Sequence, residues 1–313
     1  AWFLGGLAIL ITLDLWLVDQ RYLNKDNFVS KRQQETSWAM TPADEYILAD
    51  PDVHYRVANL TVSPWQDGTT SYYHKSIGGY HGIKLRRYQD LIDVYLSQGL
   101  QNLIGVLNDQ PTQSQVDSVL ARQQVLNMIN TKYFILNPSS QPLRNPHAMG
   151  HGWIVNDFKL AGNADEEYLA LGNTDLRQVA VVNREFEELV SDRLRHDEVS
   201  GTVELSEYRP NHMTYEVKLD QAALVVFSEV YYDGGWKANI DGEPVPHLRA
   251  NYILRALPVE AGEHTVEFDF VFEPFEKGEK VSFAGSIFIL VLLLGFLGFQ
   301  VFSLFRKKQI LVK

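Results

Sequence analysis

An uncharged apolar run near the C-terminus constrains this chain more than any other feature. Residues 283–305 read FAGSIFILVLLLGFLGFQVFSLF, with one amide (Gln300) and no charged side chain. About 20 apolar residues in a helix cross the hydrocarbon core of a bilayer, so this run is long enough to span a membrane with some tilt. Arg306, Lys307 and Lys308 follow directly. Because basic residues beside a span stay on the cytoplasmic side, we expect a cytoplasmic C-terminus and an external chain before the run.

The first residues form a second apolar run. Residues 1–18 read AWFLGGLAILITLDLWLV, with one acid, Asp14. The run has neither the basic start nor the small-residue cleavage site of a signal peptide. We therefore expect the end of a transmembrane helix whose start is missing, with Asp14 at the membrane interface; a buried core helix is the alternative. The two runs predict a large external domain between an outgoing helix and a returning one.

The composition restricts what this external domain can bind and how it is stabilised. The formal net charge of the 313-residue chain is −11, and without residues 306–313, which carry four positive charges and no acid, it is −15. Such a charge repels nucleic acid and anionic lipid, and it argues against DNA or RNA as a partner. The chain has no cysteine, which excludes disulfides and Cys-based metal sites. An apolar core must therefore hold the domain together.

Residues 19–136 have the patterns of a mixed α/β lobe. Apolar residues at helical spacing alternate with short apolar runs that end at Asn-Pro or Asp-Pro pairs. The expected elements are a polar connector at 19–42, helices at 43–50, 82–98 and 114–130, and strands at 54–60 and 132–136. Residues 137–150 contain three prolines and Gly150, so we expect the linker between two lobes there.

Residues 151–279 have the patterns of a β-rich lobe. The expected elements before residue 201 are strands at 152–158 and 177–183 and a helix at 165–171. From about residue 201, period-two alternation predicts strands at Thr202–Tyr208, Met213–Leu219, Ala222–Tyr231, Trp236–Ile240, Tyr252–Pro258 and His264–Phe272. Turn signals such as Asp241-Gly242 separate them, which favours an antiparallel β-sandwich. The predicted fold class is α+β: a membrane-anchored external domain with a mixed α/β lobe and a β-sandwich, flanked by transmembrane helices.

Three segments carry a resemblance to a known family. They are HKSIGGYHGIKLRRYQD (74–90), ELSEYRPNHMTYEV (204–217) and SEVYYDGGWKANIDGEPVPHLRANYILRALPVEAGEHTVEFDFVFEPF (228–275). In this order, and with a membrane span after the last, they resemble the C-terminal region of the bacterial YfhO family of membrane proteins. The HKSIGGYHG segment is similar to the Bacteroidetes branch.

The resemblance implies a function that no motif of the chain shows by itself. YfhO proteins are similar to glycosyltransferases of the GT-C class, which implies transfer of a sugar from a polyprenyl-phosphate carrier to a cell-envelope acceptor outside the cytoplasmic membrane. In that class the catalytic carboxylates lie on an external loop after the first span. That loop would lie upstream of Ala1, so we assign no catalytic residue here. The expected location is the bacterial cytoplasmic (inner) membrane, with the large domain on the external or periplasmic side.

The densest basic cluster outside the C-terminal tail is the candidate binding site. Cations and interleaved aromatic rings suit a carrier phosphate or a sugar face. The candidate residues are His74, Lys75, Tyr80, His81, Lys84, Arg86 and Arg87, with Trp236 as a candidate glycan contact. The alternative is a helix start whose basic residues pair with neighbouring acids, and for Trp236 a place in the sandwich core.

Other chemistries find little support in the sequence. His147 and His151 have a spacing that suits metal ligands on a helix, but Pro146 and Gly150 disfavour a helix there, so we expect no metal site and no cofactor. The phosphate loop, the dinucleotide fingerprint and the Gly-x-Ser-x-Gly motif are all missing. Two rivals to the glycosyltransferase interpretation remain: a non-catalytic module that binds glycan or protein, and a structural cap on a transmembrane bundle.

Overall fold

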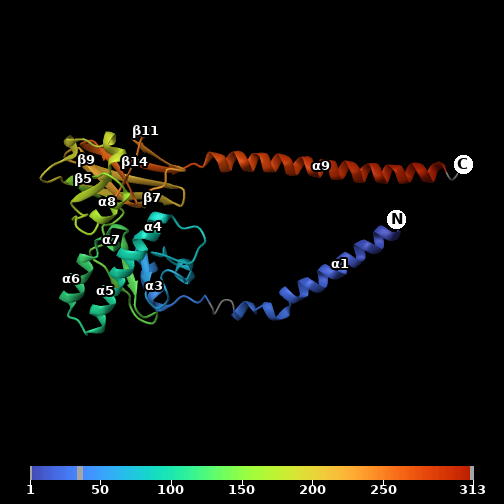
Figure 1. Ribbon diagram of the computed structural model, residues 1–313, viewed down its shortest axis with the longest axis horizontal. Coiled ribbons are helices and arrows are strands. Elements are labelled where there is room, and N and C mark those ends of the chain that lie inside the picture. Colours follow the sequence, from blue (N-terminus) through green and yellow to red (C-terminus); the bar gives the residue numbers. More distant parts are fainter. Residues whose placement is uncertain (1, 34–37, 311–313) are drawn as a thin grey trace.

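The computed structural model describes residues 2–33 and 38–310, which form a mixed α+β fold with several sheets and a long apolar helix at each end (Figure 1). The terminal helices are α1 (Trp2–Tyr22) and α9 (Glu273–Ile310). The segments Phe3–Asn27 and Glu273–Gln300 are long and apolar enough to cross a membrane, and no part of them is buried in the protein. In Figure 1 both helices leave the globular region on the same side. The two apolar runs are therefore candidate spans, while their orientation remains a prediction.

Helix α9 is longer than a bilayer requires. Its 38 residues rise ~57 Å, against ~30 Å for the hydrocarbon core. Its first turns are charged, and Lys277 donates a hydrogen bond to Glu273 at 3.1 Å. These turns belong in water, so the apolar part of the helix begins after them. Val271 and Phe272 alone separate α9 from the last strand, β14 (Gly262–Phe270).

The N-terminal part of the globular region joins short helices to a three-stranded sheet. Strand β1 pairs with β2 in parallel, and β2 pairs with β3 in the antiparallel sense. The elements are η1 (Lys25–Asn27), α3 (Pro42–Leu48), β1 (Arg56–Asn59), η2 (Thr69–Tyr72), α4 (Arg86–Leu91), η3 (Ile92–Leu96), α5 (Ser97–Asn108), α6 (Gln113–Arg122), α7 (Gln124–Met128), β2 (Thr131–Ile135) and β3 (Leu143–Arg144).

Capping residues set the start of α3. The Asp44 carboxylate accepts the Thr41 N–H at 2.9 Å, and the Thr41 hydroxyl accepts the Asp44 N–H at 3.3 Å. Pro42 occupies the first helical position, where its missing N–H costs nothing. The short helix predicted at 43–50 is confirmed within the usual error of one or two residues at each end.

The helix predicted over 82–98 has other limits in the structure. It begins later, at Arg86, and continues through the π turn η3 into α5, ending at Asn108. The helix predicted over 114–130 is interrupted at Gln123, whose ψ of 60° separates α6 from α7. Apolar spacing reveals neither a π turn nor a break of one residue, since both leave the buried positions nearly in place.

The C-terminal part of the globular region is built from two larger sheets. Their strand orders are β4-β9-β13-β12-β6-β5 and β11-β10-β14-β8-β7, and one of the sheets is curled into a half-barrel. The elements are β4 (Gly152–Val155), β5 (Asp157–Ala161), α8 (Ala164–Ala170), β6 (Val179–Asn183), η4 (Arg184–Leu189), η5 (Asp192–Leu194), β7 (Gly201–Arg209), β8 (His212–Leu219), β9 (Ala223–Val230), β10 (Trp236–Ile240), β11 (Glu243–Val245), β12 (Leu248–Ala250), β13 (Leu254–Val259) and β14.

The two sheets share an apolar cluster. Tyr215 on β8 and Phe268 on β14 come from one sheet, and Phe227 on β9 and Leu257 on β13 from the other. The ring centroids of Phe227 and Phe268 lie 5.0 Å apart, and those of Tyr215 and Phe227 4.7 Å apart. Strands are present at all six positions predicted after residue 201. The prediction missed the short strands β11 and β12. Strands β5 and β6, which lie before residue 201, pair in parallel.

A second cluster joins the two parts of the globular region. It contains Leu91 and Leu96 from the helical part together with Leu224, Val226 and Ala256 from the six-stranded sheet. The helices therefore cover one face of this sheet, and the five-stranded sheet covers part of the other. At about 25 cal/mol per Å² of apolar surface, such burial dominates the stability of the domain.

Candidate functional site

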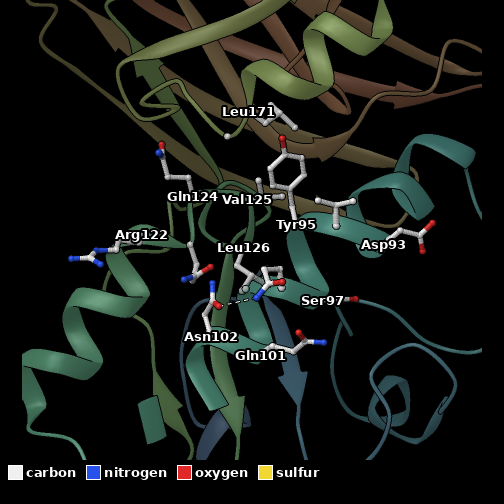
Figure 2. A pocket seen from close by; sticks show the side chains of 15 residues that line it. Asp93, Tyr95, Ser97, Gln101, Asn102, Arg122, Gln124, Val125, Leu126 and Leu171 are labelled. Atoms are coloured by element: carbon white, nitrogen blue, oxygen red, sulfur yellow. Dashed lines mark hydrogen bonds between the residues drawn. The ribbon is translucent and has the colours of Figure 1, made fainter. Parts of the chain in front are cut away.

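A cleft of about 550 Å³ lies between the helices of the N-terminal part and the turn that follows α8 (Figure 2). Five of its lining residues carry side-chain amides, and four are aliphatic. The lining residues are Asp93, Val94, Tyr95, Ser97, Gln98, Gly99, Gln101, Asn102, Arg122, Gln123, Gln124, Val125, Leu126, Leu171 and Gly172. In Figure 1 the helices that form it lie away from the side on which α1 and α9 leave.

The amides of this cleft are positioned but only partly used. The Gln98 amide donates to the Asn102 side-chain carbonyl at 2.9 Å (Figure 2), and the Gln124 carbonyl accepts the Leu176 N–H at 2.7 Å. Each of these three side chains thereby keeps donors or acceptors for a ligand. Arg122 has no hydrogen bond or ion pair with any residue that the structure describes.

Two local features shape the cleft. The π turn η3 inserts one extra residue ahead of α5, which places Tyr95 at the rim with its hydroxyl donating to the Tyr168 carbonyl at 2.9 Å. Gly99 faces the α6–α7 corner, where a Cβ atom would lie 2.9 Å from Gln123 Oε1 and 3.0 Å from Leu126 Cδ1. The absence of a side chain at Gly99 thus allows the close helix approach that forms the base of the cleft.

The chemistry of this lining is that of recognition. Amides, a guanidinium and a tyrosine around apolar side chains offer directed hydrogen bonds to hydroxyl groups and contact with an apolar face. Asp93 is the one acid among the lining residues. Glycoside hydrolysis needs a pair of carboxyl groups about 5–10 Å apart, so the cleft lacks that constellation.

The sequence-predicted basic cluster does not form one surface. The His74 ring is buried and pairs with Asp44 at 2.8 Å. The Lys75 ammonium lies 3.3 Å from the Tyr208 ring centroid and contacts His54 Nδ1, inside the junction with the sheets. These two residues therefore stabilise the interior in the structure, and their role in ligand binding remains untested.

The two arginines of the cluster differ from each other. Arg86 is highly exposed and pairs with Asp90 at 2.8 Å on the same helix. Arg87 donates to the buried Glu167 at 3.1 Å and lies 4.4 Å from the Tyr252 ring centroid. Arg87 thereby joins α4 to the C-terminal part.

Glu167 stabilises an unusual backbone at Tyr252. Its carboxylate accepts the Tyr252 N–H at 3.0 Å, while Tyr252 has a φ of 71°, in the left-handed region that few tyrosines adopt. Burial raises the pKa of Glu167, although the nearby Arg249 and Arg87 oppose that effect. The Tyr252 hydroxyl donates to Asp90 at 2.8 Å. A strained residue is thus held by groups from both parts of the globular region.

Three residues of the predicted cluster remain accessible on one loop. Tyr80 is 80% exposed, and His81 and Lys84 have no hydrogen bond or ion pair within the described part of the chain. Trp236, in contrast, is half-buried on β10. The Arg255 guanidinium lies 3.8 Å from its ring centroid, and Phe270 packs against it edge-on at 5.3 Å. One face of the indole is therefore covered by the protein itself.

A group of buried charges joins β1 to the sheets. Glu229 on β9 contacts the His54 ring and lies 3.7 Å from the Arg56 guanidinium. Burial would raise the pKa of Glu229, but His54 and Arg56 lower it to about 2. Burial lowers the pKa of His54. Because Lys75 has only donors, His54 Nδ1 accepts from it, and Nε2 carries the proton that His54 donates to Glu229.

The two histidines considered as metal ligands have different partners. His147 pairs with Asp117 at 3.0 Å and His151 with Asp52 at 2.7 Å. Among the described residues, no group of three or more His, Cys, Asp or Glu side chains could hold a metal ion.

The cleft itself was not predicted from the sequence. Gln and Asn residues at 98–102 and 123–124 are compatible with any solvated helix. They become a site only through the tertiary approach of α5 to the α6–α7 corner. Gly99, a glycine inside a helical pattern, was the one local sign of that approach.

Comparison with known proteins identifies one part of the chain. Residues 175–282 match the family model described as bacterial membrane protein YfhO. The matched segment runs from the turn before β6 into the first turns of α9. It includes the whole five-stranded sheet and strands β6, β9, β12 and β13 of the six-stranded sheet, but not β4 or β5. No curated protein and no solved structure matches the chain. The match covers about a third of the chain, and over that segment the chain is similar to YfhO bacterial membrane proteins.

Proposed function

We propose, from the YfhO match and the two candidate spans, that this chain is the external glycan-handling region of an envelope glycosyltransferase. Sugar transfer from a polyprenyl-phosphate carrier would use carboxylates on a loop outside this chain, as in GT-C enzymes. The globular region would hold the acceptor glycan. The C-terminus would lie in the cytoplasm, because Arg306, Lys307 and Lys308 follow the second apolar run.

The amide-lined cleft carries this proposal. Its volume of about 550 Å³ is within the range of ligand sites, and its lining suits hydroxyl-rich ligands. Asn102, Gln98 and Gln124 would pair with sugar hydroxyls, and Val125 or Leu126 would contact an apolar sugar face. Since α5 and α6 lie away from α1 and α9, the cleft favours an envelope acceptor over the lipid carrier (Figure 1).

The proposal is tested by the kinetics of the complete protein in proteoliposomes. Gln98→Ala combined with Asn102→Ala should raise the KM for the acceptor roughly tenfold, which corresponds to ~1.4 kcal/mol of lost binding. The KM for the carrier-linked sugar should not change. Gln113→Ala, an exposed amide on α6 outside the cleft, is the matched control. An acceptor KM equal to that of the wild type in the double variant would refute the assignment.

The second candidate is a non-catalytic glycan-binding module, favoured by the single acid in the cleft. Deletion of residues 19–279 separates the two functions. Transfer that disappears while the remaining protein still inserts supports a place in the catalytic cycle. Transfer that persists supports a separate binding module or a structural cap.

A further inference from the structure

The loop of residues 78–85, here called the contact loop, presents apolar and basic side chains to solvent. Ile83 is 92% exposed and Tyr80 80% exposed, the highest values among large apolar residues of the globular region. His81 is exposed and Lys84 is half-buried, neither side chain has a partner within the described residues, and the loop contains no acid. Exposed apolar side chains that are grouped on one loop, such as Tyr80 and Ile83, are typical of a contact surface.

The contact loop is fixed at its base. Gly79 has a φ of 116° and its N–H donates to the Pro64 carbonyl at 2.7 Å. A Cβ atom at Gly78 would lie 2.2 Å from the same carbonyl oxygen and 2.6 Å from the Trp65 ring. Glycine is required at both positions, and the resulting close fit directs the following residues outward.

An aromatic pair stands beside this loop. Trp38 and Tyr72 stack with ring centroids 4.9 Å apart, and they are 40% and 59% exposed. The Tyr73 hydroxyl donates to the Trp38 carbonyl, which ties the chain arriving from α1 to the segment that leads into the contact loop. Exposed tryptophan and tyrosine are enriched where proteins meet the interface of a bilayer.

The position of the contact loop fits a bilayer surface. The loop leading into α4 projects toward the side on which α1 and α9 leave the globular region (Figure 1). The charged start of α9, residues 273–280, rises only ~12 Å before the apolar run, and the headgroup layer is itself several ångströms thick. The globular region is thereby held within reach of the headgroups.

We propose that the contact loop and the Trp38–Tyr72 pair seat the globular region on the outer surface of the bilayer. Ile83 and Tyr80 enter the interfacial layer, and Lys84 lies at the level of the lipid phosphates. The charge of the partner follows from that of the loop: a basic loop on an acidic protein fits anionic headgroups. This proposal needs the two helices to cross the bilayer, and it is independent of sugar transfer.

The chain lacks cysteine, so a single introduced cysteine can carry an environment-sensitive fluorophore without background. Ile83→Cys probes the contact loop, Ile104→Cys probes an exposed isoleucine on α5, and Phe288→Cys probes the apolar part of α9. Each full-length variant is labelled in vesicles of phosphatidylethanolamine and phosphatidylglycerol, with or without a lipid that carries a nitroxide at its headgroup.

The emission of the label at position 83 should shift to the blue, and the nitroxide lipid should quench most of its fluorescence. The label at position 104 should keep a water-like spectrum. A water-like label at 83 beside a quenched label at 288 overturns the proposal while leaving the spans intact. A blue shift at 83 without quenching overturns it as well, because the loop would then contact protein. A label at 288 with a water-like spectrum also overturns the proposal, because the proposal requires α9 to cross the bilayer.

The charge of the loop gives a second readout. In the labelled Ile83→Cys protein, quenching should be stronger in phosphatidylglycerol vesicles than in purely zwitterionic ones. Adding Lys84→Gln should remove most of this difference. A lipid dependence that is unchanged by Lys84→Gln overturns the role of Lys84 at the phosphates.

Discussion

At the scale of single residues, the junction around Glu229 combines several ionisable groups in little space. Neutral His54 accepts from Lys75 and donates to Glu229, so the ring can fulfil both roles in one tautomer only. Burial lowers the pKa of Lys75 to about 8, which leaves its ammonium largely charged at neutral pH. The stability of this junction therefore depends on each partner being present.

Replacing Glu229 should destabilise the domain strongly. Glu229→Gln leaves Arg56 and the buried Arg255 without their counter-charge, and removal of one partner of a buried pair costs roughly 3–5 kcal/mol. Denaturant unfolding in detergent, followed by near-ultraviolet circular dichroism, measures this loss. Glu260→Gln, which breaks an exposed pair with Arg193, is the control and should cost less than about 1 kcal/mol. Equal losses in both variants would contradict this account.

The same junction predicts a loss of stability in acid. The pKa of folded His54 lies below its unfolded value of 6.5, so between the two the unfolded chain binds more protons and stability falls as the pH is lowered. Glu229 adds a second loss between about pH 4.5 and 2. Melting temperatures from pH 7.5 to 4 test the first window. His54→Gln should flatten the slope there, and an unchanged slope would assign the effect to other groups.

At the scale of elements, the approach of α5 to the α6–α7 corner creates the cleft, and two glycines of one helix allow a matched test. A methyl group at Gly99 would meet Gln123 and Leu126, whereas nothing lies within 4 Å of one at Gly105. Gly99→Ala should cost up to about 1 kcal/mol, because the methyl group displaces the ends of the Gln123 and Leu126 side chains and disturbs the hydrogen bond from Gln123 to the Val119 carbonyl. Gly105→Ala should stabilise by about 0.5–1 kcal/mol. Thermal unfolding measures the change in stability of both variants. A Gly99→Ala protein that is more stable than the wild type would show that the added methyl group fits without disturbing Gln123 or Leu126.

Elements were predictable where a local pattern decides the structure. The six strands after residue 201 follow from alternation and turn residues, and at Asp241-Gly242 both residues have positive φ, as an Asp-Gly hairpin turn requires. The π turn and the short strands β11 and β12 have no comparable pattern, because packing decides them. Local pattern also does not reveal that the basic cluster is divided between interior and surface, because burial of His74 and Lys75 depends on Asp44 and Glu229, which are distant in the sequence.

At the scale of the whole molecule, the shared core makes the two parts of the globular region dependent on each other. The sheet residues Leu224, Val226 and Ala256 are buried in the cluster that also contains the helix residues Leu91 and Leu96. A fragment of residues 151–271 would expose that face of the sheet to water.

We therefore expect this fragment to aggregate or to bind a hydrophobic dye, while residues 38–271 unfold in one cooperative transition. Size-exclusion chromatography and calorimetry distinguish these outcomes. Cooperative unfolding of the shorter fragment would mean that the linker expected at 137–150 separates independent domains.

The junction between β14 and α9 has a mechanical consequence. Val271 donates to the Gly235 carbonyl at 2.9 Å and Phe275 to the Phe272 carbonyl at 3.0 Å, so hydrogen bonding continues almost without interruption from sheet to helix. Because only Val271 and Phe272 separate the two elements, we expect a rotation of the sheet to be passed largely to the helix. The sheet and α9 should then tilt together about a point at the level of the lipid headgroups. A ligand that reorients the globular region would change the tilt of α9 in the bilayer. A change in bilayer thickness would, in turn, reorient the globular region.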